Sequence, residues 1–253
     1  MPLRNLCKLK VYSPNYSCAP LRTILLSKRV VLRLGSSKPH PISDNTIQLN
    51  SPTGIQISSD KRHSKKYMDI AHVKHAEWLV SDNESEIREF FNTYGTIIIK
   101  KYNSCKGNNI YYIDSEEVLN TWLSEHSTEL NKFVCEKYYF YKREYRFHVS
   151  KKHGIFYSCR KLLRNDATDT WHRHDSNSVW ILPTNPKFKT PPFLNEIEED
   201  CKRYMEVTGL DICAFDVKSD DNSYIILESN TSPSLGEVGL NVYKNYFYKY
   251  YGN

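Results

Sequence analysis

Short apolar runs mark the beginning of the chain. Leu9–Tyr12 and Val30–Leu34 predict two strands, and Leu21–Leu26 between them is expected to be helical. The polar stretch from Ser36 to Asp60, rich in Ser, Pro and Asn, has the composition of a loop. We therefore predict a small α/β domain over residues 1–66.

A second pattern of apolar and polar residues covers residues 67–132. Its start overlaps a stretch around Asp60–Ala71 that is expected to be helical. The capping signal Ser81–Glu84 predicts a helix to about Asn92, because acidic side chains favour the positive end of a helix. Further predicted elements are the Ile-rich strand Thr96–Lys100, the strand Ile110–Ile113 and a helix that opens at Ser115. These elements predict a second α/β unit.

Residues 133–253 are rich in predicted strands. Two hairpins are expected, Arg146–Ser150 with Gly154–Arg160, and Ile212–Lys218 with Tyr224–Ser229. Between them, apolar residues at helical spacing predict a helix over Phe193–Val207. The tail from Asn241 is expected to be a further helix.

The second hairpin carries the most informative polar residues. Side chains alternate along a strand, so Asp216 shares one face with Lys218, while Tyr224, Glu228 and Asn230 share one face of the next strand. If Lys218 pairs with Tyr224, Asp216 lies diagonal to Glu228, about 7–8 Å away. Two carboxylates and an amide oxygen suit Mg²⁺ or Mn²⁺. The alternative is a solvated face, but flanking apolar residues imply burial, where unpaired acids are costly.

A phosphate cradle is expected after the Ile-rich strand. Lys100 ends that strand, and the small polar loop at 103–109 can turn backbone amides toward a phosphate while the lysine supplies charge. The loop residues with this expected role are Ser104, Lys106, Gly107 and Asn108. The segment is not a Walker A loop, and a plain turn is the alternative.

A basic cluster lies on the first hairpin. Arg146, His148 and, across the hairpin, Arg160 are expected to form a cationic wall, since the guanidinium fork binds phosphate oxygens in pairs. The alternative is a set of surface ion pairs, such as Glu144 with Lys161, each contributing little.

The segment Trp171–Asn177 combines aromatic, basic and amide side chains between the two hairpins. Contact with phosphates or with an acceptor is one interpretation of this composition. A connecting loop is the other, and the sequence favours neither.

The composition limits the class of protein without deciding it. The 253 residues are 40% hydrophobic, enough for a core, and the charge of +6 with a pI near 8.8 suits either nucleic acid or a triphosphate. Seven cysteines without a C-x-x-C pair argue against a disulfide framework or a structural zinc site. The sequence shows no signal peptide and no apolar stretch long enough for a bilayer, so we expect a soluble, cytoplasmic protein.

The order of these motifs resembles the ATP-grasp superfamily, in particular the ribosomal-protein glutamate ligases and the ATP-grasp proteins encoded by bacteriophages. The resemblance covers about residues 60–240 and is most specific at 216–218 and 226–234. It implies an α+β fold in which two subdomains, 67–132 and 133–253, clasp ATP behind the small N-terminal domain. Three departures are the single glycine of the phosphate loop, Glu144 in place of the usual Asp, and Asp175 where an Arg is expected two residues before Asn177.

The resemblance also implies roles for individual residues. The phosphates would be contacted by Lys100, Arg146 and Arg160, which would act in catalysis. The magnesium ligands would be Asp216, Glu228 and Asn230. Nucleotide contacts are implied for Lys100, Ser104, Lys106, Gly107, Asn108, Glu136, Lys137, Tyr138, Glu144 and Asn177.

These features favour an ATP-dependent carboxylate–amine ligase. A substrate carboxylate would attack the γ-phosphate to give an acyl phosphate and ADP, and an amine of an amino acid, peptide or protein would then displace phosphate. The alternatives are a kinase of the same fold and a basic binding protein without turnover. A nucleic-acid partner is not expected, and a phage-encoded protein would act in the host cytoplasm.

Overall fold

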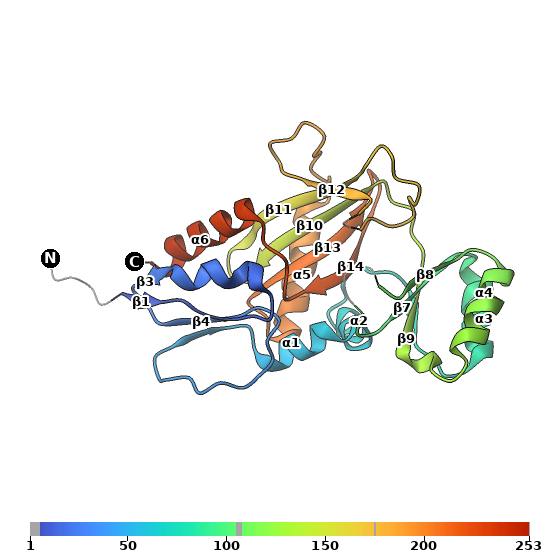
Figure 1. Cartoon of the computed structure of the whole chain (residues 1–253), viewed down its shortest axis with the longest axis horizontal. Coiled ribbons are helices and arrows are strands. Elements are labelled where there is room, and N and C mark those ends of the chain that lie inside the picture. The colour runs from blue at the N-terminus through green and yellow to red at the C-terminus, as the bar shows by residue number, and fades with distance from the viewer. Residues whose placement is uncertain (1–5, 105–107, 175, 253) are drawn as a thin grey trace.

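The computed structural model describes residues 6–104, 108–174 and 176–252 of the chain. Three parts follow one another along its long axis (Figure 1): N-terminal strands with the C-terminal helix beside them, a central sheet, and a lobe that carries two helices. None of the helices in these ranges is both long and apolar enough to cross a membrane.

The N-terminal part is built on a three-stranded parallel sheet. Its elements are β1 (Cys7–Lys8), β2 (Lys10–Tyr12), the 3-10 helix η1 (Tyr16–Thr23), β3 (Leu25–Leu26), β4 (Val30–Arg33) and β5 (Ile47–Leu49). The sheet order is β2-β4-β5, and β1 pairs separately with β3. The helix predicted over Leu21–Leu26 lies earlier in the chain, because the Asn15 side chain accepts a hydrogen bond from the Ser17 amide and caps η1 there.

Two helices follow this part in the chain and pack against the central sheet, α1 (Pro52–Ser59) and α2 (Lys61–Ile70). The stretch predicted to be a loop up to Asp60 therefore contains α1 as well as β5. The Ser51 side chain caps α1 by accepting from the Gly54 amide. Gly54 also packs so closely that a Cβ would lie 2.6 Å from the Thr208 carbonyl oxygen. The polar composition thus conceals a helix that is held by its cap and by tertiary packing.

The lobe contains a four-stranded antiparallel sheet with the order β6-β9-β7-β8. Its elements are β6 (Trp78–Leu79), α3 (Glu84–Tyr94), β7 (Ile97–Lys101), β8 (Ile110–Ile113), α4 (Glu116–His126), the 3-10 helix η2 (Leu130–Lys132) and β9 (Phe133–Lys137). Because β9 pairs with β6 and β7, residues 133–137 belong to this sheet, although the sequence analysis assigned them to the following subdomain. Helices α3 and α4 pack on one face, where Phe91 and Trp122 meet Ile97 and Ile99. The other face carries Lys100 and Glu136.

The central sheet has five antiparallel strands in the order β12-β11-β10-β13-β14. Its elements are β10 (Arg143–Ser150), β11 (Gly154–Leu163), β12 (Ser178–Ile181), α5 (Leu194–Thr208), β13 (Ile212–Ser219), β14 (Tyr224–Asn230) and α6 (Glu237–Tyr251). Both predicted hairpins and the helix that ends at Gly209 are confirmed. Tyr204 of α5 packs against Phe215 on one face of this sheet.

Helix α6 covers only part of the opposite face of the central sheet. Its Tyr243 hydroxyl lies 2.8 Å from His148 Nδ1, and the same helix joins the N-terminal strands in one apolar cluster. The remainder of that face carries charged residues, among them Glu144, Arg146 and Asp216. The candidate site is built on this remainder and on the bare face of the lobe sheet.

Candidate functional site

The hairpin of β13 and β14 places Asp216 directly opposite Glu228. The predicted register is wrong, because Ser219 rather than Lys218 pairs with Tyr224, and an irregularity after Asp216 leaves Leu227 without a partner. This bulge reverses the alternation along β14, so Glu228 shares the face of Asp216 as predicted, whereas Tyr224, predicted on that face, lies on the opposite one. Directly paired residues have Cβ atoms about 4.5–5.5 Å apart, closer than the diagonal that was expected.

Asp216 is held by Arg146 of β10 through two hydrogen bonds. Arg146 donates from Nε to Oδ1 at 2.6 Å and from Nη2 to Oδ2 at 2.7 Å. Burial opposes ionisation of this carboxyl, but the guanidinium outweighs it and lowers the pKa of Asp216. Asp216 is therefore a carboxylate at neutral pH.

The other two predicted metal ligands lie on the same strand end. Glu228 is half-buried and makes no hydrogen bond or ion pair with the described residues. Asn230 Oδ1 accepts a hydrogen bond from the Ser232 amide at 2.9 Å. Carboxylate and amide oxygens keep further lone pairs, so Asp216, Glu228 and Asn230 together fit a hard divalent cation. The structure thus brings the three predicted ligands to one place on the sheet.

A buried triad occupies the facing sheet. Glu136 of β9 lies 2.9 Å from Lys100 Nζ of β7 and 3.4 Å from Lys65 Nζ of α2. Burial opposes its charge, but the two ammonium groups lower the pKa of Glu136 to about 2. Burial also lowers the pKa of Lys65, which has Lys100 as a like-charged neighbour. Lys65 was not among the predicted site residues, although its position on the buried face of α2, beside Met68, is a signal that could have identified it.

A second group of charges surrounds Glu144. This buried carboxylate lies 3.3 Å from Lys161 Nζ and 3.8 Å from Arg173 Nη1. The Glu144–Lys161 ion pair is therefore present, but it is buried instead of lying on the surface. Lys218 lies beyond it, with its ammonium 4.9 Å from the Tyr138 ring centroid, and burial lowers the pKa of Lys218 to about 8. These cations extend the site across the gap between the two sheets.

Two members of the predicted cationic wall do not join Arg146. Arg160 pairs with Tyr145 in the register, which places it on the α5 face, and it donates to the carbonyls of Lys187 and Phe188. His148 shares the face of Arg146 but is buried against α6, and burial lowers its pKa to about 3, so the ring is neutral. The predicted cationic wall is wrong for both residues. Arg160 lies on the other face of the sheet, and α6 covers His148, so neither side chain reaches the gap between the sheets.

Solved structures with the same architecture are ATP-grasp ligases. The ATP-grasp ligase PsnB complexed with a minimal precursor matches with a TM-score of 0.57 and 17% identity, over 74% of this chain and 56% of that chain. The D-alanyl-alanine synthetase A of Vibrio cholerae gives 0.61 and 14%, over 77% and 62%. The D-alanine–D-alanine ligase of Bacillus anthracis gives 0.60 and 14%, over 81% and 67%. The chain has an ATP-grasp fold.

These matches rest on structure alone. No protein-family model matches the sequence, and no curated protein sequence matches it either. The chain spans 56% and 62% of the length of the first two ligases named above. At such low identity the comparison establishes the α+β ATP-grasp fold predicted from the sequence and leaves the reaction to be argued from the site.

In this ATP-grasp fold, an aromatic cluster closes one end of the gap between the sheets. The Tyr112 ring stacks on Trp171 with 5.3 Å between centroids and meets Tyr138 edge-on at 5.2 Å. The Tyr138 hydroxyl donates to the Trp171 carbonyl at 3.1 Å. Of these rings, only Tyr138 was predicted to contact the nucleotide, and Trp171 was undecided. In the structure Tyr138 lies beside Lys218, and Trp171 stacks on Tyr112.

Several predicted nucleotide contacts have other partners in this structure. Asn177 donates to the carbonyls of Asp169 and His172, each at 2.9 Å, and its oxygen accepts from the His174 amide, so it organises its own loop. Lys137 lies at the end of β9, with its ammonium 3.8 Å from Glu77. These bonds give Asn177 a positioning role in the loop.

The predicted phosphate loop is described only in part. Lys106 and Gly107 lie outside the described residues. The Ser104 hydroxyl donates a hydrogen bond to the Lys101 carbonyl at 2.8 Å, and Asn108 is exposed. Asn109 has a positive φ of 52°, which fits the tolerance of Asn for left-handed backbone.

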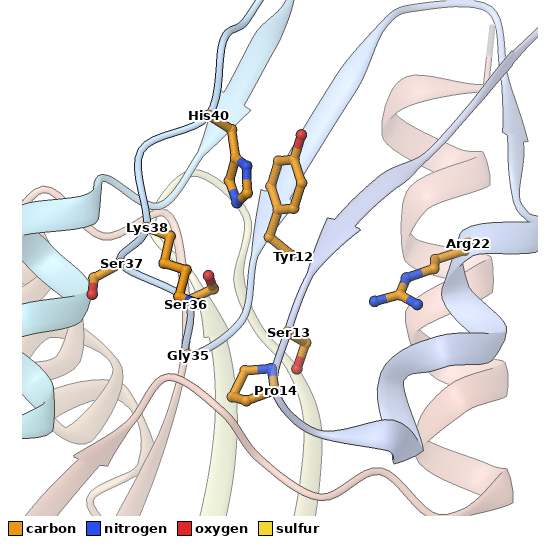
Figure 2. Close-up of a pocket in the computed structure, with 9 residues that line it drawn as sticks. All are labelled: Tyr12, Ser13, Pro14, Arg22, Gly35, Ser36, Ser37, Lys38 and His40. Carbon is orange, nitrogen blue, oxygen red and sulfur yellow. The ribbon is translucent and has the colours of Figure 1, made fainter.

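A cavity opens where β2 and β4 end. It has a volume of about 400 Å³, and its lining includes Arg22, Ser36 and Lys38. Figure 2 shows Arg22 on one side and the stacked rings of Tyr12 and His40 on another; the centroids of these rings lie 3.7 Å apart. The lining thus combines two cationic side chains with hydroxyl groups, which suits an anionic ligand.

The cavity wall is in contact with the chain that follows the metal-binding strand. Gly35, in the lining, has a φ of +78°, and a Cβ there would lie 2.5 Å from Ser232 Cβ. The Asn15 amide approaches Ser234 Oγ at 3.3 Å. Ser232 also binds Asn230, so the cavity and the candidate metal ligands are joined through a single short segment.

Proposed function

We propose that the chain is an ATP-dependent carboxylate–amine ligase that works through an acyl phosphate. The observation that carries this proposal is the convergence of Lys65, Lys100, Arg146 and Lys218 on the gap that also holds Asp216 and Glu228. A binding protein with a merely basic surface would leave its lysines in water. Here the cations are buried and arranged about two carboxylates, as a triphosphate with its metal ion requires.

The proposed reaction begins with a carboxylate oxygen of the substrate. That oxygen attacks the γ-phosphorus of ATP, the bond between the γ-phosphorus and the β–γ bridging oxygen breaks, and ADP leaves with the electron pair. The amine nitrogen then attacks the carbonyl carbon of the acyl phosphate, and phosphate leaves as the C–N bond forms and the nitrogen loses a proton. Lys65, Lys100 and Arg146 contribute fixed positive charge to the transferred phosphoryl group, and the two sheets hold the reactants in place.

Asp216, Glu228 and Asn230 are the residues that would hold the divalent cation. Mg²⁺ bound there would neutralise charge on the phosphates. Glu228 supports this assignment most directly, because it is a half-buried carboxylate that makes no hydrogen bond or close ion pair with the described residues.

The cavity of Figure 2 supports an anionic substrate. Arg22 and Lys38 line it, and Ser232 connects it to the metal-binding strand, so a carboxylate held there lies on the side of the N-terminal domain. Amino acids and peptides with a free carboxylate are the substrate class that this charge favours. The amine acceptor would enter from the same side of the gap.

The test is ADP formation from Mg-ATP with a panel of amino acids and peptides. We expect stimulated ADP release, a new amide bond by mass spectrometry, and at least a hundredfold loss of turnover in Glu228→Gln and Asp216→Asn, since oriented charge at a transferring phosphate is worth about 3 kcal/mol or more. Asp44→Asn, an exposed acid of the N-terminal domain, is the matched control. Unchanged turnover in both site variants would refute the metal assignment, and a stable phosphate ester in place of an amide would identify a kinase.

A further inference from the structure

The loop between β11 and β12 gathers three metal-ligating side chains outside the nucleotide site. One ligand atom from each of Asp169, His172 and His174 lies within 4.8 Å of the others. His172 Nδ1 is 3.4 Å and His174 Nε2 is 3.9 Å from Asp169 Oδ2. A tetrahedral zinc site with bonds of 2.0–2.1 Å has ligand–ligand edges of about 3.3 Å. We propose that Asp169, His172 and His174 bind a Zn²⁺-type transition-metal ion.

The acidic member of the cluster is already oriented for this role. Asp169 Oδ1 accepts a hydrogen bond from the Trp171 amide at 3.3 Å, while Oδ2 faces both imidazole rings. On the far side of His174, Nδ1 is bound to Ser176 Oγ at 2.6 Å, which leaves Nε2 directed at the carboxylate. A hydrogen bond on the second ring nitrogen is the usual support of a metal-bound histidine.

His172 is the member of the cluster whose buried ring nitrogens lack hydrogen bonds within the described residues. Both of its ring nitrogens are buried and make no hydrogen bond with the described residues, although Nδ1 lies 3.4 Å from Asp169 Oδ2. An orphaned buried nitrogen is costly, and a metal bond would satisfy it.

Hydrogen bonds from Asn177 hold the loop around the cluster. Asn177 bonds to the backbone of Asp169, His172 and His174, which fixes the loop beneath the three ligands. The nearby cations Lys161 and Arg173 are directed toward Glu144, so the two histidines and one carboxylate form a local site of moderate negative charge.

The donor set distinguishes this site from the magnesium site. Two imidazole nitrogens and one carboxylate suit zinc and its neighbours, whereas the oxygen ligands Asp216 and Glu228 suit Mg²⁺. The cysteine pattern could not reveal the site, because it uses no thiol. A bound ion would fix Trp171, whose ring centroid lies 4.2 Å from that of His172, against the aromatic end of the nucleotide gap.

The full chain is treated with a chelator and then titrated with Co²⁺ as the probe ion. Excess Mg²⁺ is present throughout to occupy the oxygen site. We expect one equivalent of Co²⁺ per chain, the visible absorption of a four- or five-coordinate cobalt ion, and displacement by Zn²⁺. Co²⁺ should also quench Trp171 fluorescence, and Trp171→Phe should lose that part of the quenching. The readout is independent of ATP turnover, so its failure and the failure of the proposed reaction are distinguishable.

His172→Gln and Asp169→Asn should each weaken Co²⁺ binding at least tenfold. His63→Gln, an exposed histidine of α2, and Glu228→Gln, in the magnesium site, should bind as the wild type does. Substoichiometric uptake by the wild type would overturn the proposal even if a variant failed to fold. Unchanged binding in both ligand variants, or its loss in Glu228→Gln, would also overturn it.

Discussion

Replacing Glu136 with Gln tests the buried triad in which this carboxylate pairs with Lys65 of α2 and Lys100 of the lobe. Glu136 is 3% exposed and neutralises Lys100 at 2.9 Å and Lys65 at 3.4 Å. Glutamine has the same shape without the charge, so two ammonium groups would be left in a region that water hardly reaches. Removal of one partner from a buried ion pair typically costs about 3–5 kcal/mol.

The pKa of Glu136 gives a second route to the same magnitude. Its ordinary value of 4.5 is lowered to about 2 in the fold. A depressed carboxyl pKa contributes stability that is complete above the unfolded value and is lost as the pH falls through the folded one. From this pKa difference, ionised Glu136 contributes roughly 3 kcal/mol to the free energy of unfolding at pH 7. Roughly 2 kcal/mol of that contribution has been lost at pH 3.

Urea unfolding of the wild type and Glu136→Gln at several pH values measures both quantities. The difference in unfolding free energy should be about 3 kcal/mol at pH 7 and should shrink as the pH falls from 4.5 toward 2. Adding Lys65→Met to Glu136→Gln should restore part of the loss, because one unpaired ammonium is removed with it. A pH-independent difference below about 1 kcal/mol, with no rescue in the double variant, would refute the reasoning.

Other substitutions separate nucleotide contacts from structural ones. Lys65→Met should leave the unfolding free energy within about 1 kcal/mol of the wild type, since Lys100 still neutralises Glu136, but should raise the KM for ATP about tenfold through the lost charge. Arg146→Met should raise that KM and destabilise the fold by about 3–5 kcal/mol, because Asp216 is left buried without its partner. Arg160→Met should lower the free energy of unfolding by about 1–3 kcal/mol with little change in the KM for ATP. A KM effect equal to that of Arg146→Met would contradict the placement of Arg160 on the face of the sheet that points away from the nucleotide. Trp171→Ala should weaken ATP and ADP binding about tenfold alike in calorimetry, and loss of ATP binding alone would count against an aromatic base site.

The chain order of the later strands and helices could largely be predicted, because local patterns carry it, whereas α1 and β5 lie in a stretch predicted to be a loop. The two hairpins and the helix that ends at Gly209 follow from alternation, helical spacing and a left-handed cap. The register of β13 and β14 could not, because the bulge at Leu227 leaves no mark in the alternation of polar and apolar residues. Asp216 and Glu228 were therefore identified correctly as neighbours, through the wrong pairing.

Residues that approach the site from distant segments were harder to predict. Lys65 lies on a helix more than seventy positions before Glu136, and only the folded chain brings the two together. Arg160 shows the reverse case, since its neighbour Lys161 is the residue that faces the gap. Neighbouring residues of a strand point to opposite faces of the sheet, so an error of one residue places a side chain on the wrong face. Sequence spacing near a hairpin does not determine this position to within one residue.

The distribution of partners within the site indicates how a divalent cation would enter. Asp216 already binds Arg146 through both oxygens, and Glu136 and Glu144 are paired with lysines, so Glu228 is the one site carboxylate in the described chain without an ion pair. A single half-buried carboxylate and an amide oxygen bind Mg²⁺ weakly on their own. ATP would supply the further oxygens and would draw Arg146 toward its phosphates, which releases Asp216 to the ion. We therefore expect Mg-ATP to raise the melting temperature, while Mg²⁺ alone at the same concentration leaves it unchanged; equal shifts would show that the metal site is complete without the nucleotide.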